Sequence, residues 1–290
     1  MDQFLMPLIF ACFVWWLSTG IVLWRARQNR ETFAWTALTS TFAMMMAMLA
    51  VFVLRNETSV AAAYGGFIAG IILWGWHEVL FLLGYISGPN KDPCPKGLAL
   101  GERFIVSAKT VIHHEIAIVI HGALVLVLSW QAPNMVAFAT FAVLWAMRLS
   151  SKLLIFSGAP RINEALLPAH LEYLGSYFSK ATSPPAFFLS TAMAVGATAV
   201  FAALAGASSS APFASTQWTL LATLSGLAVL ELIALVAPIP DRFLWAWALP
   251  PEGATEQDAT ADLNTNTQSP TGYKKKSALS GTRLGVPQEL

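Results

Sequence analysis

The chain contains seven runs of apolar residues, each long enough to cross the hydrocarbon core of a bilayer as a helix. A transmembrane helix needs about 20 consecutive and mainly apolar residues. The runs are Phe4–Trp24, Phe33–Leu54, Ala61–Ser87, Phe104–Trp130, Pro133–Phe156, Ala186–Ala205 and Gln217–Val236. We therefore predict an all-α, polytopic membrane protein with seven transmembrane helices.

The composition agrees with a membrane protein. Hydrophobic residues make up 56% of the chain and charged residues 11%, whereas soluble domains carry about 25% charged residues. Membrane lipids are therefore the expected surroundings. The formal net charge is +1 and no basic stripe runs through the body of the chain, so we expect no nucleic-acid partner. The two cysteines, Cys12 and Cys94, indicate neither a disulfide framework nor a zinc site.

Two segments depart from the apolar pattern. Between the fifth and sixth runs, apolar residues recur at helical spacing over Arg161–Lys180, which predicts an amphipathic helix lying on the membrane surface. From Pro250 to Leu290 the apolar content falls sharply. We predict a transmembrane domain over residues 1–249 and a disordered cytoplasmic tail over residues 250–290.

Basic residues are divided unevenly between the two sides of the predicted bundle. Only Arg55 lies in an even-numbered connection. The odd-numbered connections and the segment after the last run hold Arg25, Arg27, Arg30, Lys91, Lys96, Arg103, Arg161, Lys180, Arg242, Lys274, Lys275, Lys276 and Arg283. Cytoplasmic loops are enriched in Lys and Arg. The N-terminus is therefore predicted on the outer, periplasmic side and the C-terminus in the cytoplasm.

Ionisable residues lie inside four of the apolar runs, where a charge at the helix centre costs about 3 kcal/mol or more. They are His77 and Glu78 in the third run, Lys109, His113, His114, Glu115 and His121 in the fourth, Arg148 and Lys152 in the fifth, and Glu231 in the seventh. With a rise of about 1.5 Å per residue, one residue from each of these runs, namely His77, His113, Arg148 and Glu231, lies at a common level roughly 10–16 Å from the cytoplasmic edge. We expect the three carboxylates to face the three cations there.

Several functions are compatible with this cluster. Its simplest interpretation is a set of ion pairs that holds the bundle together. Neutral imidazole also ligates metals, including the magnesium of a chlorin or the iron of a haem, and the candidate ligands are His77, His113, His114 and His121. Ala117, four residues before His121, is small enough to lie beside a flat macrocycle.

Transport and enzyme catalysis are further alternatives. Polar clusters inside a membrane mark substrate paths, but paired broken helices in two halves of the chain are not apparent. The histidine boxes of membrane hydroxylases and an ExxH motif are missing, and no catalytic residue can be assigned, so an enzyme is not favoured. His170, on the predicted surface helix, belongs either to a polar face at the interface or to a lid over the cytoplasmic mouth of the cluster.

Longer motifs accompany these residues. They are Trp15-Trp16-Leu17-Ser18-Thr19-Gly20, Trp74-Gly75-Trp76-His77-Glu78 with Gly88-Pro89, His113-His114-Glu115, Leu144-Trp145-Ala146-Met147-Arg148-Leu149-Ser150 with Lys152, Pro168, His170-Leu171, Tyr173-Leu174 and Ser176-Tyr177-Phe178, and Leu227-Ala228-Val229-Leu230-Glu231 with Pro240-Asp241 and Leu244-Trp245. In these motifs, residues 1–249 resemble the photosynthetic complex assembly proteins called PuhE, which are encoded beside reaction-centre genes in purple phototrophs.

The resemblance implies a role in building the bacterial photosynthetic apparatus within the inner, intracytoplasmic membrane. It implies subunits of the reaction centre or of the core light-harvesting complex, or other assembly factors, as partners. It fixes no reaction and no ligand. Our hypothesis is an assembly factor that handles or senses bacteriochlorophyll, or a precursor tetrapyrrole, through the cluster. The alternative is a membrane metalloenzyme or transporter of pigment biosynthesis that uses the same residues.

Overall fold

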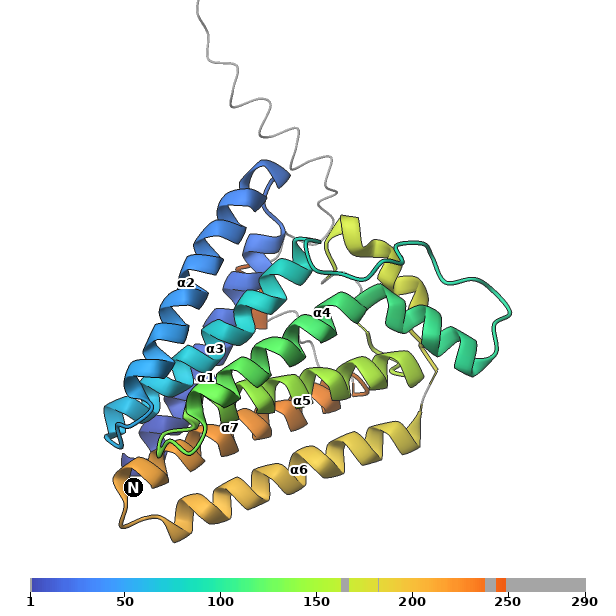
Figure 1. The fold of residues 1–290 in the computed structure, drawn as a ribbon. Helices are drawn as coiled ribbons and strands as arrows, with labels where there is room; N and C mark the ends of the chain where they lie inside the picture. The colour runs from blue at the N-terminus through green and yellow to red at the C-terminus, as the bar shows by residue number, and fades with distance from the viewer. Residues whose placement is uncertain (1, 163–166, 182, 238–243, 249–290) are drawn as a thin grey trace, which may run out of the picture. The chain divides into compact units, whose positions relative to one another are not determined.

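The computed structural model describes residues 2–162, 167–181, 183–237 and 244–248, and within them the fold is entirely helical (Figure 1). The long helices are α1 Asp2–Ala26, α2 Phe33–Leu54, α3 Val60–Leu82, α4 Leu100–Ser129, α5 Val136–Ser157, α6 Pro184–Ala207 and α7 Pro212–Ala234. All seven are long and apolar enough to cross a membrane, which confirms the predicted fold class. The predicted tail, residues 250–290, lies outside the described residues.

Helix α3 is the central element of the bundle. In its most apolar window 56% of the residues are buried within the protein, whereas the corresponding value for α6 is 0%. Small residues let α5 approach it closely: a Cβ on Gly70 would lie 2.8 Å from the Ala137 carbonyl oxygen. The fully buried rings of Phe67 and Phe141 fill the same core. The centre of α3 is therefore surrounded by protein rather than by lipid.

Helix α3 ends earlier than the sequence indicates, at Leu82 instead of Ser87. Gly84 adopts a φ of 81°, in the left-handed region. The Tyr85 N–H donates to the Leu80 carbonyl at 2.9 Å and the Gly84 N–H to the Phe81 carbonyl at 2.9 Å, a pairing that closes helices at a left-handed glycine. The predicted boundary was therefore wrong because Gly84 terminates the helix before the apolar run ends.

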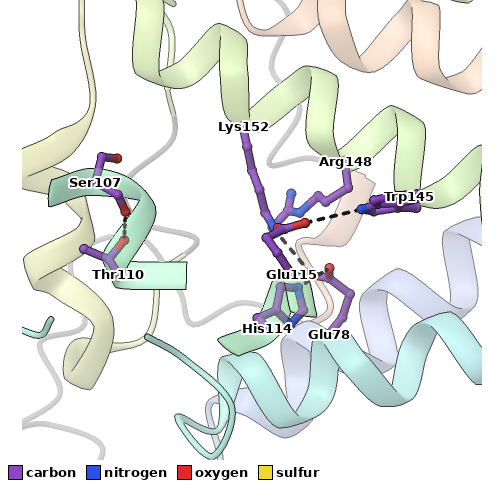
Figure 2. Close-up of polar contacts among 8 residues, drawn as sticks. All are labelled: Glu78, Ser107, Thr110, His114, Glu115, Trp145, Arg148 and Lys152. Atoms are coloured by element: carbon purple, nitrogen blue, oxygen red, sulfur yellow. Dashed lines mark hydrogen bonds and ion pairs between the residues drawn. The ribbon is translucent and has the colours of Figure 1, made fainter. Parts of the chain in front are cut away.

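Gly88 instead anchors the α3–α4 connection on α4. Its N–H donates to the Thr110 carbonyl at 2.7 Å, and a Cβ at this position would lie 1.8 Å from the Lys109 carbonyl oxygen. The Thr110 hydroxyl donates to the Ser107 carbonyl at 2.7 Å (Figure 2). Helix α4 bends in this region (Figure 1), as expected where outside groups compete for the carbonyls of the helical ladder.

The connections gather at two ends of the bundle. The Asn134 side chain donates to the Leu54 carbonyl at 3.1 Å and its N–H to the Arg55 carbonyl at 3.0 Å, which joins the α4–α5 and α2–α3 connections. At the other end the Cys94 N–H donates to the Ser176 hydroxyl at 2.8 Å and so joins the α3–α4 and α5–α6 connections. This alternation agrees with the predicted sorting of basic residues. Which end faces the cytoplasm stays a prediction.

The segment predicted as an amphipathic helix over Arg161–Lys180 is different in the structure. Its ordered element is a short 3-10 helix, η3, over Ala169–Tyr177, and residues 163–166 lie outside the described part. Leu171 and Leu174 pack against Phe81 and Leu82 at the end of α3. Its buried residues recur every third position, which is the period of a 3-10 helix. The element is therefore docked on the bundle.

Candidate functional site

The polar cluster lies where α3, α4, α5 and α7 come together near one end of the bundle. Glu78 belongs to α3, His114 and Glu115 to α4, and Arg148 and Lys152 to α5 (Figure 2). Glu78 and Lys152 lie within about two helical turns of the ends of their helices. Because α3 ends at Leu82, the cluster is closer to this end than the sequence indicates.

Glu78 is at the centre of the first contact group. One of its carboxylate oxygens lies 3.5 Å from an Arg148 guanidinium nitrogen, and the other lies 3.7 Å from Nε2 of His114. The side chains of Glu78 and His114 are 13% and 0% exposed. The carboxylate of Glu78, largely removed from water, needs the cation of Arg148, since a buried charge without a partner is strongly unfavourable.

Glu115 forms the second contact group. The Lys152 ammonium donates to Oε1 of Glu115 at 2.6 Å, and the Trp145 indole N–H donates to Oε2 at 3.3 Å (Figure 2). Trp145, Arg148 and Lys152 share one face of α5, because residues three and four apart are neighbours on a helix surface. That face supplies both cations to the carboxylates of α3 and α4.

Glu231 of α7 joins the cluster through a neutral partner. Its Oε1 accepts a hydrogen bond from the Ser151 hydroxyl at 3.0 Å. Within the described residues, no Lys or Arg lies within ion-pair distance of Glu231. The expected pairing of three acids with three cations therefore exists for two acids, Glu78 and Glu115.

A histidine pair forms a separate, apolar part of the site. Nε2 of His77 lies 2.8 Å from Nδ1 of His121, and Nε2 of His121 lies 3.4 Å from the Met48 sulfur. A thioether sulfur only accepts, so in neutral rings Nε2 of His121 carries the proton and its Nδ1 accepts from His77. Trp76 and Phe141 flank both rings. Nδ1 of His77 is then left as a buried acceptor, and it has no hydrogen-bond partner.

Two predicted members of the cluster point elsewhere. Lys109 and His113 are exposed on the outside of α4, whereas the adjacent His114 is completely buried. Neighbouring residues on a helix differ in direction by about 100°, and here His114 faces inward whereas His113 faces outward. Lys109 makes no ion pair within the described residues, and its expected pairing with a carboxylate was wrong.

His170 lies beyond the cluster, at the end of α3. Its Nε2–H donates to the Leu82 carbonyl at 2.8 Å, and its ring lies 5.8 Å from that of Phe33. Helix η3 thereby covers the end of α3. This position suits a cap over that end of the bundle, so a lid role for His170 stays a prediction.

The imidazoles do not form one metal-ligand set. His121 directs its two ring nitrogens at two different partners, and the rings of His77 and His114 are 6.3 Å apart. Across the described ranges, no three His, Cys, Asp or Glu side chains are placed to hold a metal ion. Glu78, His114, Glu115, Arg148 and Lys152 are called the ionic group below. Of the four candidate ligands, His77 and His121 contact each other, His114 is buried in the ionic group and His113 is exposed.

The ionic group is closely packed but its hydrogen bonding is incomplete. Both ring nitrogens of His114 and Nε of Arg148 are buried without a hydrogen-bond partner. Unpaired polar atoms of this kind cost about 1–3 kcal/mol each. The Arg148 side chain is nevertheless 36% exposed, so the cluster reaches the surface of the bundle at this residue.

Comparisons with known proteins bear on this arrangement. The family described as "Protein of unknown function (DUF3623)" matches residues 1–256. The chain belongs to this family. A relative from Rhodobacter capsulatus, described as an uncharacterized 30.4 kDa protein in the puhA 5′ region, is 36% identical over 242 residues, which cover 82% of this chain and 88% of the relative. No solved structure shows a significant match.

Family membership confirms the resemblance found in the sequence, and two of its motifs meet in the structure. The Trp16 indole donates to the Leu244 carbonyl at 2.7 Å, and the Trp245 indole donates to the Trp16 carbonyl at 3.2 Å. A Cβ on Gly20 would lie 2.1 Å from the Trp247 ring. This contact between α1 and residues 244–248 was not predicted. The sequence feature that could have indicated this contact is the presence of tryptophans in both motifs, Trp15-Trp16 in one and Trp245 in the other.

Proposed function

We propose that this protein assists the assembly of the bacterial photosynthetic apparatus, the reaction centre or its core light-harvesting complex, from within the inner membrane. The gene of its Rhodobacter capsulatus relative lies in the puhA 5′ region, which is a photosynthesis gene region. The resemblance to the PuhE proteins supports the same role. The seven apolar helices suit a factor that meets hydrophobic subunits or pigments inside a bilayer.

The observation that carries the proposal is the incomplete ionic group. Polar residues inside a membrane are expensive and usually have a functional partner. Arg148 is paired with Glu78 yet keeps a buried Nε without a partner and is 36% exposed. An acidic or carbonyl group on a nascent subunit, or a carboxyl or keto group on a tetrapyrrole, would meet the exposed part of the Arg148 side chain. Arg148 is therefore the contact residue, while Glu78 and His114 orient it.

A second candidate, direct ligation of a chlorin, is favoured by a different observation. His113 is an exposed imidazole on α4, among the exposed side chains of Ile112 and Ile116. Neutral imidazole can ligate the central metal of a tetrapyrrole, and a flat macrocycle can reach this ring from outside the bundle. His77 and His114 are completely buried, so we assign them no direct ligation. Because the imidazoles do not converge, we do not extend the proposal to a metalloenzyme.

The test of Arg148 uses its replacement in a phototrophic host. In a strain that carries Arg148→Gln in place of the natural gene, we expect a several-fold loss of core complex absorption that exceeds any fall in the abundance of the protein. Arg55→Gln, at a partly exposed basic residue of the opposite end, is the control and should leave both unchanged. If the complexes formed normally, or fell only in proportion to the abundance of the protein, the cluster would be structural.

The test of His113 is spectroscopic. Protein purified from the phototrophic host should carry a tetrapyrrole absorption band, and His113→Leu should remove the band without lowering the yield. His121→Leu serves as the comparison for a buried ring, which would lower stability instead. A purified protein that carries no pigment would exclude direct ligation while leaving the assembly role open to the Arg148 test.

A further inference from the structure

A pocket of about 310 Å³ lies at the basic end of the bundle, apart from the ionic group. Its volume is at the lower end of the range of about 300–1,000 Å³ that small ligands occupy. It is bounded by the start of α2, the end of α3 and helix η3. Three connections that are distant in sequence therefore build one concave site.

The rim of this pocket is basic. Arg30 comes from the 3-10 helix η1, which spans Arg30–Thr32, and Lys91 comes from the α3–α4 connection. Both side chains are exposed, and neither makes an ion pair within the described part of the chain. Among the described residues, those that line the pocket include no carboxylate. The two cations of the rim produce a positive potential that favours an anion.

Hydroxyl and imidazole groups line the interior. Tyr173 of η3 lies beside Ser87, and burial raises the pKa of the Tyr173 phenol, which therefore stays protonated and able to donate. His170 lines the same wall and is oriented by its bond to the Leu82 carbonyl. The Tyr173 hydroxyl adds specificity to the charge of Arg30 and Lys91, since oxyanions are recognised through charge-assisted hydrogen bonds.

The floor of the pocket is apolar and lies at the level where two helices end. Phe33 begins α2, Leu83 follows the last residue of α3, and Leu171 is buried in η3. Helix ends of this kind mark the surface of the hydrocarbon core, where lipid head groups lie. A basic rim over an apolar floor at this level matches a molecule with an anionic head and an apolar body.

We propose that this pocket binds the phosphate of an anionic membrane lipid, with Arg30 and Lys91 at the charged oxygens and Tyr173 as a neutral donor. The ligand chemistry is a phosphate oxyanion, which a lipid head group or a free phosphate ion can supply. The site lies outside the ionic group that contains Arg148, so the assignment does not depend on the assembly role.

The test uses the full-length protein, stripped of lipid in a neutral detergent and returned to bilayers. The bilayers contain phosphatidylcholine alone or mixed with phosphatidylglycerol. We expect phosphatidylglycerol to raise the unfolding temperature, because a ligand that binds only the folded state stabilises it, and to be retained in native mass spectra. Arg30→Gln combined with Lys91→Gln should reduce retention several-fold, as should Tyr173→Phe to a smaller extent. Lys96→Gln, in the same connection but outside the pocket, is the matched control.

The arms of the experiment separate the two sources of phosphate. Inorganic phosphate could stabilise the protein as much as phosphatidylglycerol does, and this effect could be lost in the Arg30→Gln, Lys91→Gln variant. That result would support the phosphate site and identify the free phosphate ion as its ligand. The proposal would be overturned if the natural protein and this double variant retained phosphatidylglycerol equally. It would also be overturned if Lys96→Gln lost as much retention of phosphatidylglycerol as the double variant. If the double variant proved unstable, retention by Tyr173→Phe would decide.

Discussion

Glu78 holds together groups from two other helices, so its charge is expected to matter more than that of any single partner. It approaches Arg148 at 3.5 Å and His114 at 3.7 Å. In Glu78→Gln the guanidinium of Arg148 loses its counter-charge while remaining partly buried. We expect the free energy of unfolding to fall by about 1–3 kcal/mol, the usual cost of a buried polar group without a proper partner.

Unfolding in detergent micelles, followed by circular dichroism, would measure this change. The double variant Glu78→Gln, Arg148→Gln should be less destabilised than the sum of the single variants, with a coupling of about 0.5–3 kcal/mol as contacting residues show. Glu57→Gln, an exposed acid in the α2–α3 connection, should have little effect. Additive losses from Glu78 and Arg148 would mean that the pair contributes no coupling.

From the sequence, the charged residues that come together are predicted more accurately than the side chains that surround them. Glu78, Arg148 and Lys152 could be placed at one level by counting residues, and they do converge. Rotation about a helix axis could not be fixed in the same way, because these helices are apolar on every face and have no polar side to orient them. For this reason Met48 was missed as a partner of His121, and His113 was expected inside.

At the scale of elements, the α3–α4 connection shapes the proposed phosphate pocket, to which it contributes Ser87 and Lys91. It is held on α4 by Gly88, whose position leaves no room for a side chain. In Gly88→Ala the new Cβ would overlap the Lys109 carbonyl oxygen, which lies 1.8 Å away. The connection must then separate from α4 and lose the Gly88–Thr110 hydrogen bond, at a cost of about 1–3 kcal/mol for overpacking.

Thermal unfolding and limited proteolysis within residues 83–99 would detect this separation. Gly88→Ala should unfold at a lower temperature and be cleaved faster in the connection. Gly101→Ala is the control, because a Cβ there meets nothing within 4 Å and alanine favours a helix more than glycine does. If Gly88→Ala resembled Gly101→Ala, the close contact with α4 would not constrain the connection.

Helix boundaries were predicted well where an apolar run stops abruptly. They were predicted poorly where the conformation of a turn residue determines the end of the helix. Helices α2 and α5 follow their apolar runs closely. At the end of α3 the decisive residue is Gly84, which the hydrophobic pattern conceals because apolar residues continue to Ile86. Helix α4 begins at Leu100, before its apolar run, because the Glu102 side chain accepts a hydrogen bond from the Ala99 N–H at 3.1 Å.

At the scale of the whole bundle, the connections and their charges sort onto two ends. The end that contains the phosphate pocket carries Arg25, Arg27, Arg30, Lys91, Lys96, Arg103, Arg161 and Lys180, whereas Arg55 lies at the other end. Cytoplasmic segments of membrane proteins are rich in such residues. The ionic cluster, the cap formed by η3 and the proposed lipid site would then all lie near the cytoplasmic leaflet.

This orientation predicts opposite accessibility for two exposed positions in the full-length chain. Cysteine would be introduced by Glu57→Cys in the α2–α3 connection or by Lys96→Cys in the α3–α4 connection, after Cys12 and Cys94 have been replaced by alanine and serine. Both positions are exposed. An impermeant maleimide should label the cysteine at position 57 in spheroplasts and that at position 96 only after lysis. Labelling of both from the same side would contradict the alternating crossings, and the opposite pattern would place the pocket and the ionic cluster beneath the outer leaflet.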